Sequence, residues 1–429
     1  MQSPDVTGPY LKMIKSVKEK TYNLLRWSEK YTKTDMVYLA HGGFWLTLGQ
    51  AVSAASSFFI AIAFANLLPQ ESYGTYKYVL SVASILSLAV LPGINTAVVR
   101  AIAKGDEASI IIATKEKIKW GILGGLGSLA MALFYYLNKN FELSIIFLII
   151  SAFIPLMDSF SIYDSYLQGK KYFEKSAKYS VWSQLIYLTA ILIGIFLTKN
   201  ILVLIIFYFS TWTIIRYIFY NRVIKKINNK ADPEVIKYGR HLTYLQIFNS
   251  VSEQAGKLIL FNFFGAKELA IYAVAIAPTE QIVGLLKSSS VLIMPKFATQ
   301  TYDTISKNII KKTFKFIFVA ACITITYFFL APLLFKIIFP RYFPDAVFYS
   351  QIYSLSLVGT AMIIPKTLFL AHKETAKLYT QNIVVSSVKL ILYILLSYKF
   401  GIMGLIISVI AARLTSLLLS IRLSQKSTR

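Results

Sequence analysis

Four positively charged side chains lie deep inside long apolar segments of the chain. Lys257, Lys287, Lys389 and Arg413 all belong to the second half of the sequence. A charge within the hydrocarbon of a membrane is unfavourable, and it is usually kept for a transport pathway or for a partner of opposite charge. These cations are therefore candidates for binding an anionic group, or else for structural ion pairs within the protein.

Two acidic residues lie in similar surroundings in the same half. Glu253 and Glu280 can each take up a proton or a sodium ion, or can pair with a neighbouring lysine. Glu253 stands four residues before Lys257, a helical spacing at which two side chains can neutralise each other, and Glu280 shares a helical face with Lys287. An ion-coupling site and a buried ion pair are both open interpretations for each acid.

Three other cations, Lys77, Arg216 and Lys366, lie within one or two helical turns of the end of an apolar run. Long basic side chains at such positions extend to the membrane interface, so we assign these three to that role. The three histidines lack the spacing of a metal site, and a single cysteine excludes an intramolecular disulfide. We predict no metal, no other cofactor and no catalytic residue.

Polar positions in two apolar segments repeat at a fixed offset. A shift of 196 residues superposes two trios, Gln50, Ser53 and Ser57 on Gln246, Asn249 and Glu253. The spacing within each trio puts its side chains on one face of a helix. Internal repeats with a binding site at their interface are a common plan for membrane transporters, so these stripes are candidates for the lining of a site.

Composition and run length indicate a helical membrane protein. Of 429 residues, 56% are hydrophobic and 15% are charged, whereas soluble domains carry about 25% charged residues. A transmembrane helix needs about 20 mostly apolar residues. Six runs in each half meet this requirement: 43–68, 76–99, 120–137, 141–167, 181–198, 201–220, 241–264, 269–295, 313–339, 347–370, 378–398 and 401–423. We predict an all-α polytopic membrane protein with twelve transmembrane helices.

The distribution of basic residues predicts the orientation. With a cytoplasmic N-terminus, the cytoplasmic segments hold 32 Lys and Arg residues and the external turns hold six. The positive-inside rule therefore favours two cytoplasmic termini, and we expect the plasma membrane as the location. The net charge of +25 follows this pattern, so we expect no nucleic-acid partner. The predicted parts are an amphipathic segment (1–40), six helices (41–222), a linker (223–240), six more helices (241–423) and a tail (424–429).

The segment from Gly42 to Gly105 carries a family resemblance. Its order of features, from Gln50 through LLPQESYG to PGINTAVVR, resembles the polysaccharide biosynthesis proteins, and LQGKKYFEKS and FLAHKETAKL add weaker signals. That family includes Wzx-type flippases of O-antigen and related lipid-linked oligosaccharides. It shares a superfamily with lipid II flippases and with multidrug and toxin extrusion transporters. The resemblance implies two six-helix lobes around a central cavity, and a polyprenyl-diphosphate-linked glycan as cargo.

With such a cargo, the polar residues of the spans have expected roles. A diphosphate needs a cation-lined site. We expect contacts to the diphosphate from Lys257, Lys287, Lys389 and Arg413. We expect glycan selectivity from Gln50, Asn95, Gln246 and Asn249. We expect Glu253 or Glu280 to couple transport to Na⁺ or H⁺.

Two other functions are considered. A cation-coupled drug exporter of the same superfamily is expected to carry an acid on its first helix, where this chain offers Gln50, Ser53 and Ser57. A polysaccharide polymerase or glycosyltransferase needs a sizeable loop to hold its substrates, and no external turn exceeds about ten residues. We therefore predict a non-enzymatic flippase whose partners are the lipid-linked oligosaccharide, membrane lipids, and a polysaccharide polymerase and other assembly proteins.

Overall fold

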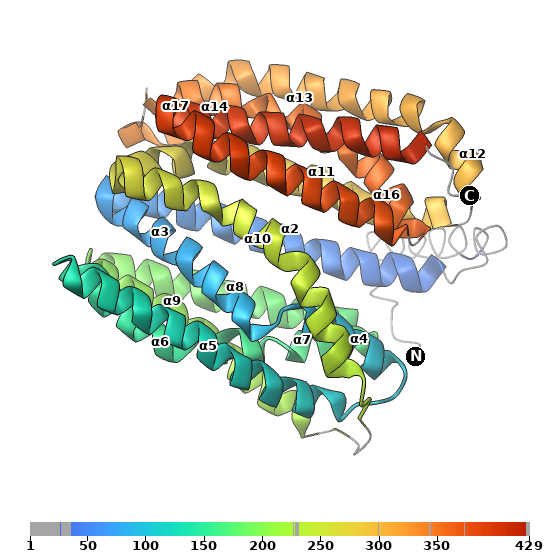
Figure 1. Ribbon diagram of the computed structural model, residues 1–429, viewed down its shortest axis with the longest axis horizontal. Helices are drawn as coiled ribbons and strands as arrows, with labels where there is room; N and C mark the ends of the chain where they lie inside the picture. Colours follow the sequence, from blue (N-terminus) through green and yellow to red (C-terminus); the bar gives the residue numbers. More distant parts are fainter. Residues whose placement is uncertain are drawn as a thin grey trace, which may run out of the picture.

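The computed structural model describes residue 26 and residues 36–425, apart from residues 226, 228–230, 299, 343, 344 and 373. Every regular element in these residues is helical, which confirms the predicted all-α class (Figure 1). The predicted amphipathic segment 1–40 lies outside the described residues except at residues 26 and 36–40, and the tail 424–429 lies outside them after residue 425.

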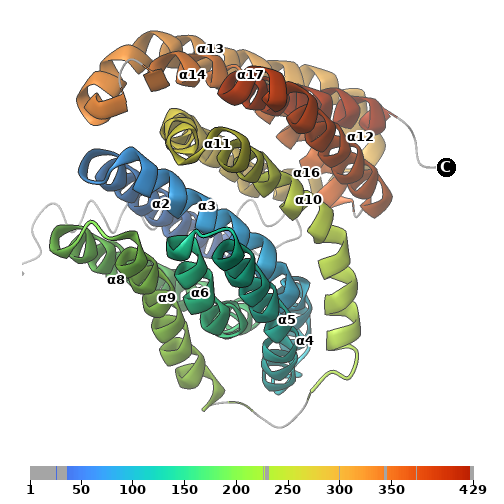
Figure 2. The same ribbon diagram turned by 60° about the vertical axis from the view of Figure 1, so that its left-hand side comes forward.

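The helices form two groups along the chain. The first group, the N-lobe, comprises α2 (Met36–Leu67), α3 (Gln70–Leu86), η1 (Ser87–Val90), α4 (Gly93–Ala103), α5 (Ser109–Leu137), α6 (Phe141–Phe160), α7 (Tyr163–Gly169), α8 (Phe173–Leu197) and α9 (Ile201–Ile224). The second group, the C-lobe, comprises α10 (Val235–Phe264), α11 (Ala266–Ala298), α12 (Tyr302–Lys307), α13 (Ile309–Ile338), η2 (Pro340–Tyr342), α14 (Asp345–Ser354), α15 (Ser356–Gly359), η3 (Thr360–Met362), α16 (Ile363–Ala371) and α17 (Thr375–Gln425). Figure 2 shows the groups on opposite sides, with α2 and α3 next to α10 and α11.

Nine helical segments of the described residues are long and apolar enough to cross a membrane. A tenth arises if α3, η1 and α4, which bend by 46° at one break, form a single span. Helix α10 is not among the nine, because polar side chains such as Glu253 and Lys257 occur along its length. Helix α17 has 51 residues and a non-helical backbone at Gly401, so it is long enough for two spans. The count of twelve remains a prediction, since it requires α10 to cross once and α17 to cross twice.

The predicted run 76–99 is not one helix. It is divided into α3, η1 and α4, and Leu91 at the break has a left-handed backbone with φ of 57°. Pro92 follows, and proline has no N–H to donate and clashes with the preceding turn of a continuous helix. Beyond the break, the Gly93 N–H donates to Thr243 Oγ1 at 3.0 Å, and a Cβ on Gly93 would lie 2.4 Å from the Thr243 nitrogen. Only glycine allows α4 to approach α10 this closely.

Several helices begin earlier than the apolar runs predict. Helices α5, α8 and α10 start at Ser109, Phe173 and Val235, whereas the runs start at 120, 181 and 241. The additional turns contain Lys, Arg and Glu residues, so helical hydrogen bonding continues past the apolar stretch. Hydropathy marks where a helix can lie in lipid and does not mark the helix ends. The predicted linker 223–240 therefore shortens to the residues between α9 and α10.

The two lobes contact each other at both ends of the bundle. At the end that holds the turns after α2 and α10, Asn66 Nδ2 donates to the Ile338 carbonyl at 2.7 Å. At the same end Tyr78 stacks on Phe261 with the ring centroids 3.8 Å apart. At the opposite end α4 packs on α10 through Gly93. These contacts set how closely the two lobes approach.

Gly74 provides a test of this packing, because a Cβ there would lie 1.7 Å from the Ala266 carbonyl oxygen. We expect Gly74→Ala to separate α3 from α11 and to lower the thermal unfolding midpoint of the detergent-purified protein, since overpacking typically destabilises by about 1–3 kcal/mol. Gly284→Ala is the matched control, because a Cβ there meets no atom within 4 Å. Equal midpoints for the two variants would contradict the tight α3–α11 contact.

Candidate functional site

A cavity of about 510 Å³ lies inside the C-lobe. Residues of α10, α11, α14, η3, α16 and α17 line it. Seven of these residues carry a charge: Glu253, Lys257, Glu280, Lys287, Lys366, Lys389 and Arg413. Five cations and two carboxylates leave an excess of three positive charges. We refer to this space as the cationic cavity.

Most of the predicted site residues line the cationic cavity: Asn249, Glu253, Lys257, Glu280, Lys287, Lys389 and Arg413. Three predicted residues, Gln50, Asn95 and Gln246, are not part of its lining. Lys366, which the sequence assigns to the membrane interface, is part of it. The short helix α16 follows the break at η3. The number of residues between Lys366 and the end of its apolar run therefore does not indicate how deeply this lysine lies in the protein. No sequence signal indicates on which side of α16 this lysine lies.

Arg413 belongs to a network that joins α11, α14, α15 and α17. Its Nη2 lies 2.5 Å from Glu280 Oε1, and its Nη1 donates to Ser356 Oγ at 2.8 Å. Tyr353 also donates to Glu280 Oε1, and the guanidinium lies 5.4 Å from the centroid of the Tyr353 ring. Glu280 thus pairs with Arg413 and not with Lys287, the partner that shares its helical face. A planar guanidinium can serve several acceptors at once, which a lysine ammonium does less well.

The four lysines of the cationic cavity have weaker partners. Lys257 donates to Gln254 Oε1 at 3.0 Å, and Lys389 lies 5.6 Å from the centroid of the Tyr393 ring. In the described part of the chain none of the four forms an ion pair, so the predicted alternative of a Glu253–Lys257 pair is not realised. Like charges repel more strongly away from bulk water. The cavity is therefore complementary to a ligand with several negative charges.

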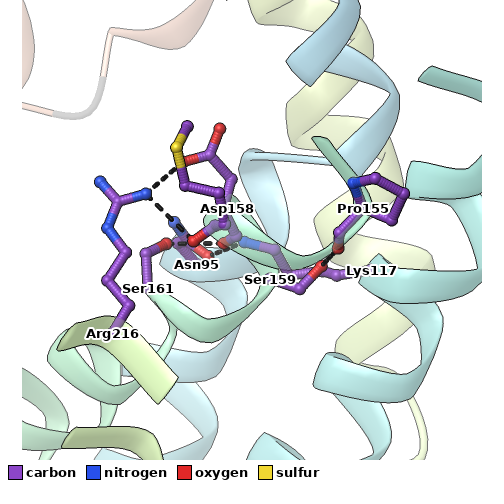
Figure 3. Close-up of polar contacts among 8 residues, drawn as sticks. Asn95, Lys117, Pro155, Asp158, Ser159, Ser161 and Arg216 are labelled. Carbon is purple, nitrogen blue, oxygen red and sulfur yellow. Dashed lines mark hydrogen bonds and ion pairs between the residues drawn. The ribbon is translucent and has the colours of Figure 1, made fainter. Parts of the chain in front are cut away.

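A second polar pocket, of about 500 Å³, lies within the N-lobe and is lined by residues of α4, α7, α8 and α9 together with Ser161. We refer to it as the N-lobe pocket. Asn95 belongs to this pocket, and Lys117 Nζ donates to its Oδ1 at 2.6 Å (Figure 3). Arg216, also assigned to the interface from sequence, lines the same pocket and pairs with Asp158 at 2.6 Å. The structure thus separates Asn95 from the expected diphosphate contacts.

Lys117 was not a candidate in the sequence, because it stands in the polar stretch before an apolar run. In the structure α5 includes that stretch, and Lys117 is only 1% exposed. Its neighbour Glu116 pairs with Arg240 of α10. Partners so distant in the chain are not visible in a sequence pattern.

The remaining predicted polar residues do not share a site. Ser288 Oγ donates to Gln50 Oε1 at 3.4 Å, which brings α2 of the N-lobe next to α11. Ser53 accepts from Gln184 Nε2 at 2.9 Å, so the stripe on α2 contacts α8 as well. Gln246 is exposed and lines neither the cationic cavity nor the N-lobe pocket. The repeated polar stripes therefore lie in different surroundings.

Residues 39–300 match the family model described as polysaccharide biosynthesis protein. The match spans more than half of the chain. The chain belongs to the polysaccharide biosynthesis protein family. This membership confirms the resemblance drawn from Gly42 to Gly105. No curated protein sequence matches the chain.

Solved structures share the fold of this polysaccharide biosynthesis protein. The lipid II flippase MurJ, in an inward closed conformation, matches with a TM-score of 0.70 and 15% identity over 89% of this chain and 87% of that chain. An inward-facing multidrug resistance MATE family transporter of the MOP superfamily gives a TM-score of 0.66 and 12% identity over 89% and 96%. A MOP superfamily transporter from Pyrococcus furiosus gives 0.60 and 12% over 91% and 96%. At these identities the likeness shows the fold alone, and it confirms the predicted fold class.

The Arg413–Glu280 pair is expected to stabilise the C-lobe as a unit. Arg413→Ala and Glu280→Ala should each lower the thermal unfolding midpoint, because each leaves a partly buried charge without its partner. The double variant should lose less than the sum, since contacting residues couple by about 0.5–3 kcal/mol. The control pair is Lys178 and Glu174, whose side chains are 57% and 44% exposed, and its effects should add. Additive losses at Arg413 and Glu280 would contradict the coupling.

Proposed function

We propose that the protein translocates a polyprenyl-diphosphate-linked oligosaccharide, such as an O-antigen, capsular or exopolysaccharide repeat unit. The observation that carries the proposal is the cationic cavity, in which five basic side chains face two carboxylates, one of them already paired with Arg413. A diphosphate offers negative charge and several strong acceptor oxygens, so lysine ammonium groups are its physical complement. Family membership and the fold shared with a lipid II flippase support the same substrate class.

A drug exporter of the same superfamily is the alternative. Its organic cations would enter a cavity with an excess of three positive charges, where like charges disfavour binding. A lipid-linked anion gains from the same charges. The electrostatics of the cavity therefore favour the flippase over the exporter.

The proposed mechanism is alternating access. The diphosphate enters the cationic cavity from the cytoplasmic side while the polyprenyl tail stays in the bilayer, and rocking of the lobes exposes the cavity to the other side. Solved MATE transporters of this fold occur in inward-facing and outward-facing conformations, which supports such a movement. No covalent bond changes in this cycle. We place the protein in the plasma membrane with both termini cytoplasmic, where a polysaccharide polymerase and other assembly proteins receive its product.

We assign coupling to a Na⁺ or H⁺ gradient to Glu253. Arg413 and Tyr353 already engage the Glu280 carboxylate, whereas Glu253 lines the cavity beside the lysines. Loading a cation at Glu253 changes the charge of the space that holds the diphosphate. The described residues contain no group of three or more His, Cys, Asp or Glu side chains that could hold a metal ion.

The function is tested by mass spectrometry of lipid-linked saccharides in cells with and without the gene, combined with an assay of the leaflet that holds them. We expect the complete repeat unit to accumulate on the cytoplasmic leaflet when the gene is absent. Complete units that reach the outer leaflet but stay unpolymerised would indicate a polymerase instead. Unchanged saccharide lipids would favour the exporter.

Removal of two lysines from the cavity tests the diphosphate contacts. We expect Lys257→Ala combined with Lys287→Ala to lower transport of the lipid-linked glycan by roughly 100-fold or more, because each lost hydrogen bond to a charged group is worth about 1.5–3 kcal/mol and about 1.4 kcal/mol is tenfold. The matched control is Lys336→Ala with Lys399→Ala, which removes the same charge from exposed positions outside the cavity. Wild-type transport by the cavity variant, with normal membrane insertion, would refute the assignment.

Substitution of Glu253 tests the coupling. Glu253→Gln keeps the shape of the side chain and removes its charge, so transport should lose its dependence on the Na⁺ or H⁺ gradient while insertion stays normal. Uptake into vesicles with and without each imposed gradient measures this dependence. Glu268→Gln, on α11 and outside the cavity, should keep wild-type dependence. A Glu253→Gln variant that still responds to the gradient would exclude Glu253 as the coupling residue.

A further inference from the structure

The N-lobe pocket differs from the cationic cavity in its charge. Its lining holds one carboxylate, Asp164, and one guanidinium, Arg216, so the charges balance. Ten of its twelve lining residues carry a hydroxyl, amide, carboxylate or guanidinium group. Its volume of about 500 Å³ is within the roughly 300–1,000 Å³ of small-ligand sites. The pocket thus suits a neutral ligand rich in hydrogen-bonding groups.

Asn95 provides this pocket with an oriented donor. Lys117 Nζ lies 2.6 Å from Asn95 Oδ1, and an ammonium group can only donate (Figure 3). The oxygen of the Asn95 amide is therefore the acceptor of that bond, and its Nδ2 group is left to donate elsewhere. Lys117, which fixes the orientation of this amide, is only 1% exposed and therefore lies inside the lobe.

Gln168 provides an oriented acceptor by the same reasoning. Its Nε2 donates to Asp164 Oδ2 at 2.7 Å, and Ser176 Oγ donates to Asp164 Oδ1. With its nitrogen engaged, Gln168 presents its Oε1 as an acceptor. A sugar hydroxyl both donates and accepts, so a pocket with a fixed donor, a fixed acceptor and several hydroxyls can satisfy it.

Arg216 contributes donors without free charge. Its Nη1 donates to Asp158 Oδ1 at 2.6 Å and to the Met157 carbonyl at 3.1 Å (Figure 3). Its guanidinium lies 4.8 Å from the centroid of the Trp212 ring. Together with Lys117 behind Asn95, the two cations match the two carboxylates Asp158 and Asp164, so the pocket does not compete with the cationic cavity for a diphosphate. The two spaces therefore select different parts of an amphiphilic molecule.

Thr96 marks the mouth of the pocket. Thr96 of α4 lines the pocket and is exposed. Arg100, one turn further along the same face, lies 5.1 Å from the centroid of the Tyr238 ring on α10. The Arg100–Tyr238 contact thus places the C-lobe one helical turn from this mouth.

We infer that the N-lobe pocket is a saccharide site, which binds sugar units of the cargo while the cationic cavity binds its diphosphate. The inference rests on the proposed function and assigns the two chemical parts of the substrate to different lobes. Asn95, Gln168 and Arg216 bind and orient sugar hydroxyls. Selectivity among glycans then resides in the N-lobe, and affinity for any polyprenyl diphosphate resides in the C-lobe.

The test compares binding of three probes to the purified protein. These are undecaprenyl diphosphate, the undecaprenyl-diphosphate saccharide extracted from the source cells, and the free saccharide released from that lipid. We expect Thr96→Phe, which fills the mouth, and Gln168→Ala, which removes the acceptor, to weaken binding of the saccharide lipid about tenfold and to leave undecaprenyl diphosphate unaffected. Ala103→Phe is the matched control, because Ala103 is exposed on the same face of α4, two turns away and outside the pocket. Lys257→Ala with Lys287→Ala should weaken both lipids.

The outcomes separate the two proposals. If Thr96→Phe and Gln168→Ala bind the saccharide lipid as Ala103→Phe does, or weaken both lipids equally, the saccharide site is wrong while the flippase proposal stands. If the wild type binds neither lipid, the flippase proposal fails. In that case, if the wild type binds the free saccharide and both variants do not, the N-lobe pocket is still supported as a site for soluble saccharides. If the wild type binds none of the three probes, the flippase proposal and the saccharide site are both overturned.

Discussion

Hydrocarbon offers no hydrogen-bond partner to the peptide backbone, so a chain within a membrane must satisfy its N–H and C=O groups internally. This constraint explains why the described residues are helical and why their breaks occur where protein covers them. At Pro92 the helix cannot continue, and the N–H of Gly93 is satisfied by Thr243 of the other lobe. Leu91, which adopts the left-handed conformation, is only 5% exposed. The break between α3 and α4 is thus also a contact between the lobes.

The sequence predicts the elements well because lipid imposes long apolar runs. The turns at Leu68 and Gly265 fall within one residue of the 196-residue offset, and the internal repeat itself stays a prediction. The sequence marks the bend at Leu91 only by the following Pro92, because hydropathy stays high through a break that α10 covers. The starts of α5, α8 and α10 were also missed, since these turns lie beyond the apolar part of each helix.

The candidate site was predictable as a set of residues and not as a set of bonds. Charges in apolar helices must turn inward, so Lys257, Lys287 and Lys389 were expected to share a space and do so. Their partners depend on packing between distant segments. Glu280 and Arg413 lie 133 residues apart in the chain, so no local spacing indicates their pair. Asn95 was expected to contribute to glycan selectivity, and the structure places it in the N-lobe pocket, apart from the cationic cavity.

The two lobes treat buried charge differently, and the difference bears on transport. The N-lobe pairs Arg216 with Asp158 and bonds Lys117 to Asn95, whereas the C-lobe leaves four lysines around a cavity without ion-pair partners in the described chain. Repulsion among these lysines destabilises any arrangement that holds them close together without a ligand. A bound anion offsets that repulsion, and it is bound most tightly in the arrangement that brings the lysines closest together. A ligand shifts a conformational equilibrium only by its differential affinity for the two states, so this lysine cluster is the feature through which the proposed anionic cargo would drive the lobes.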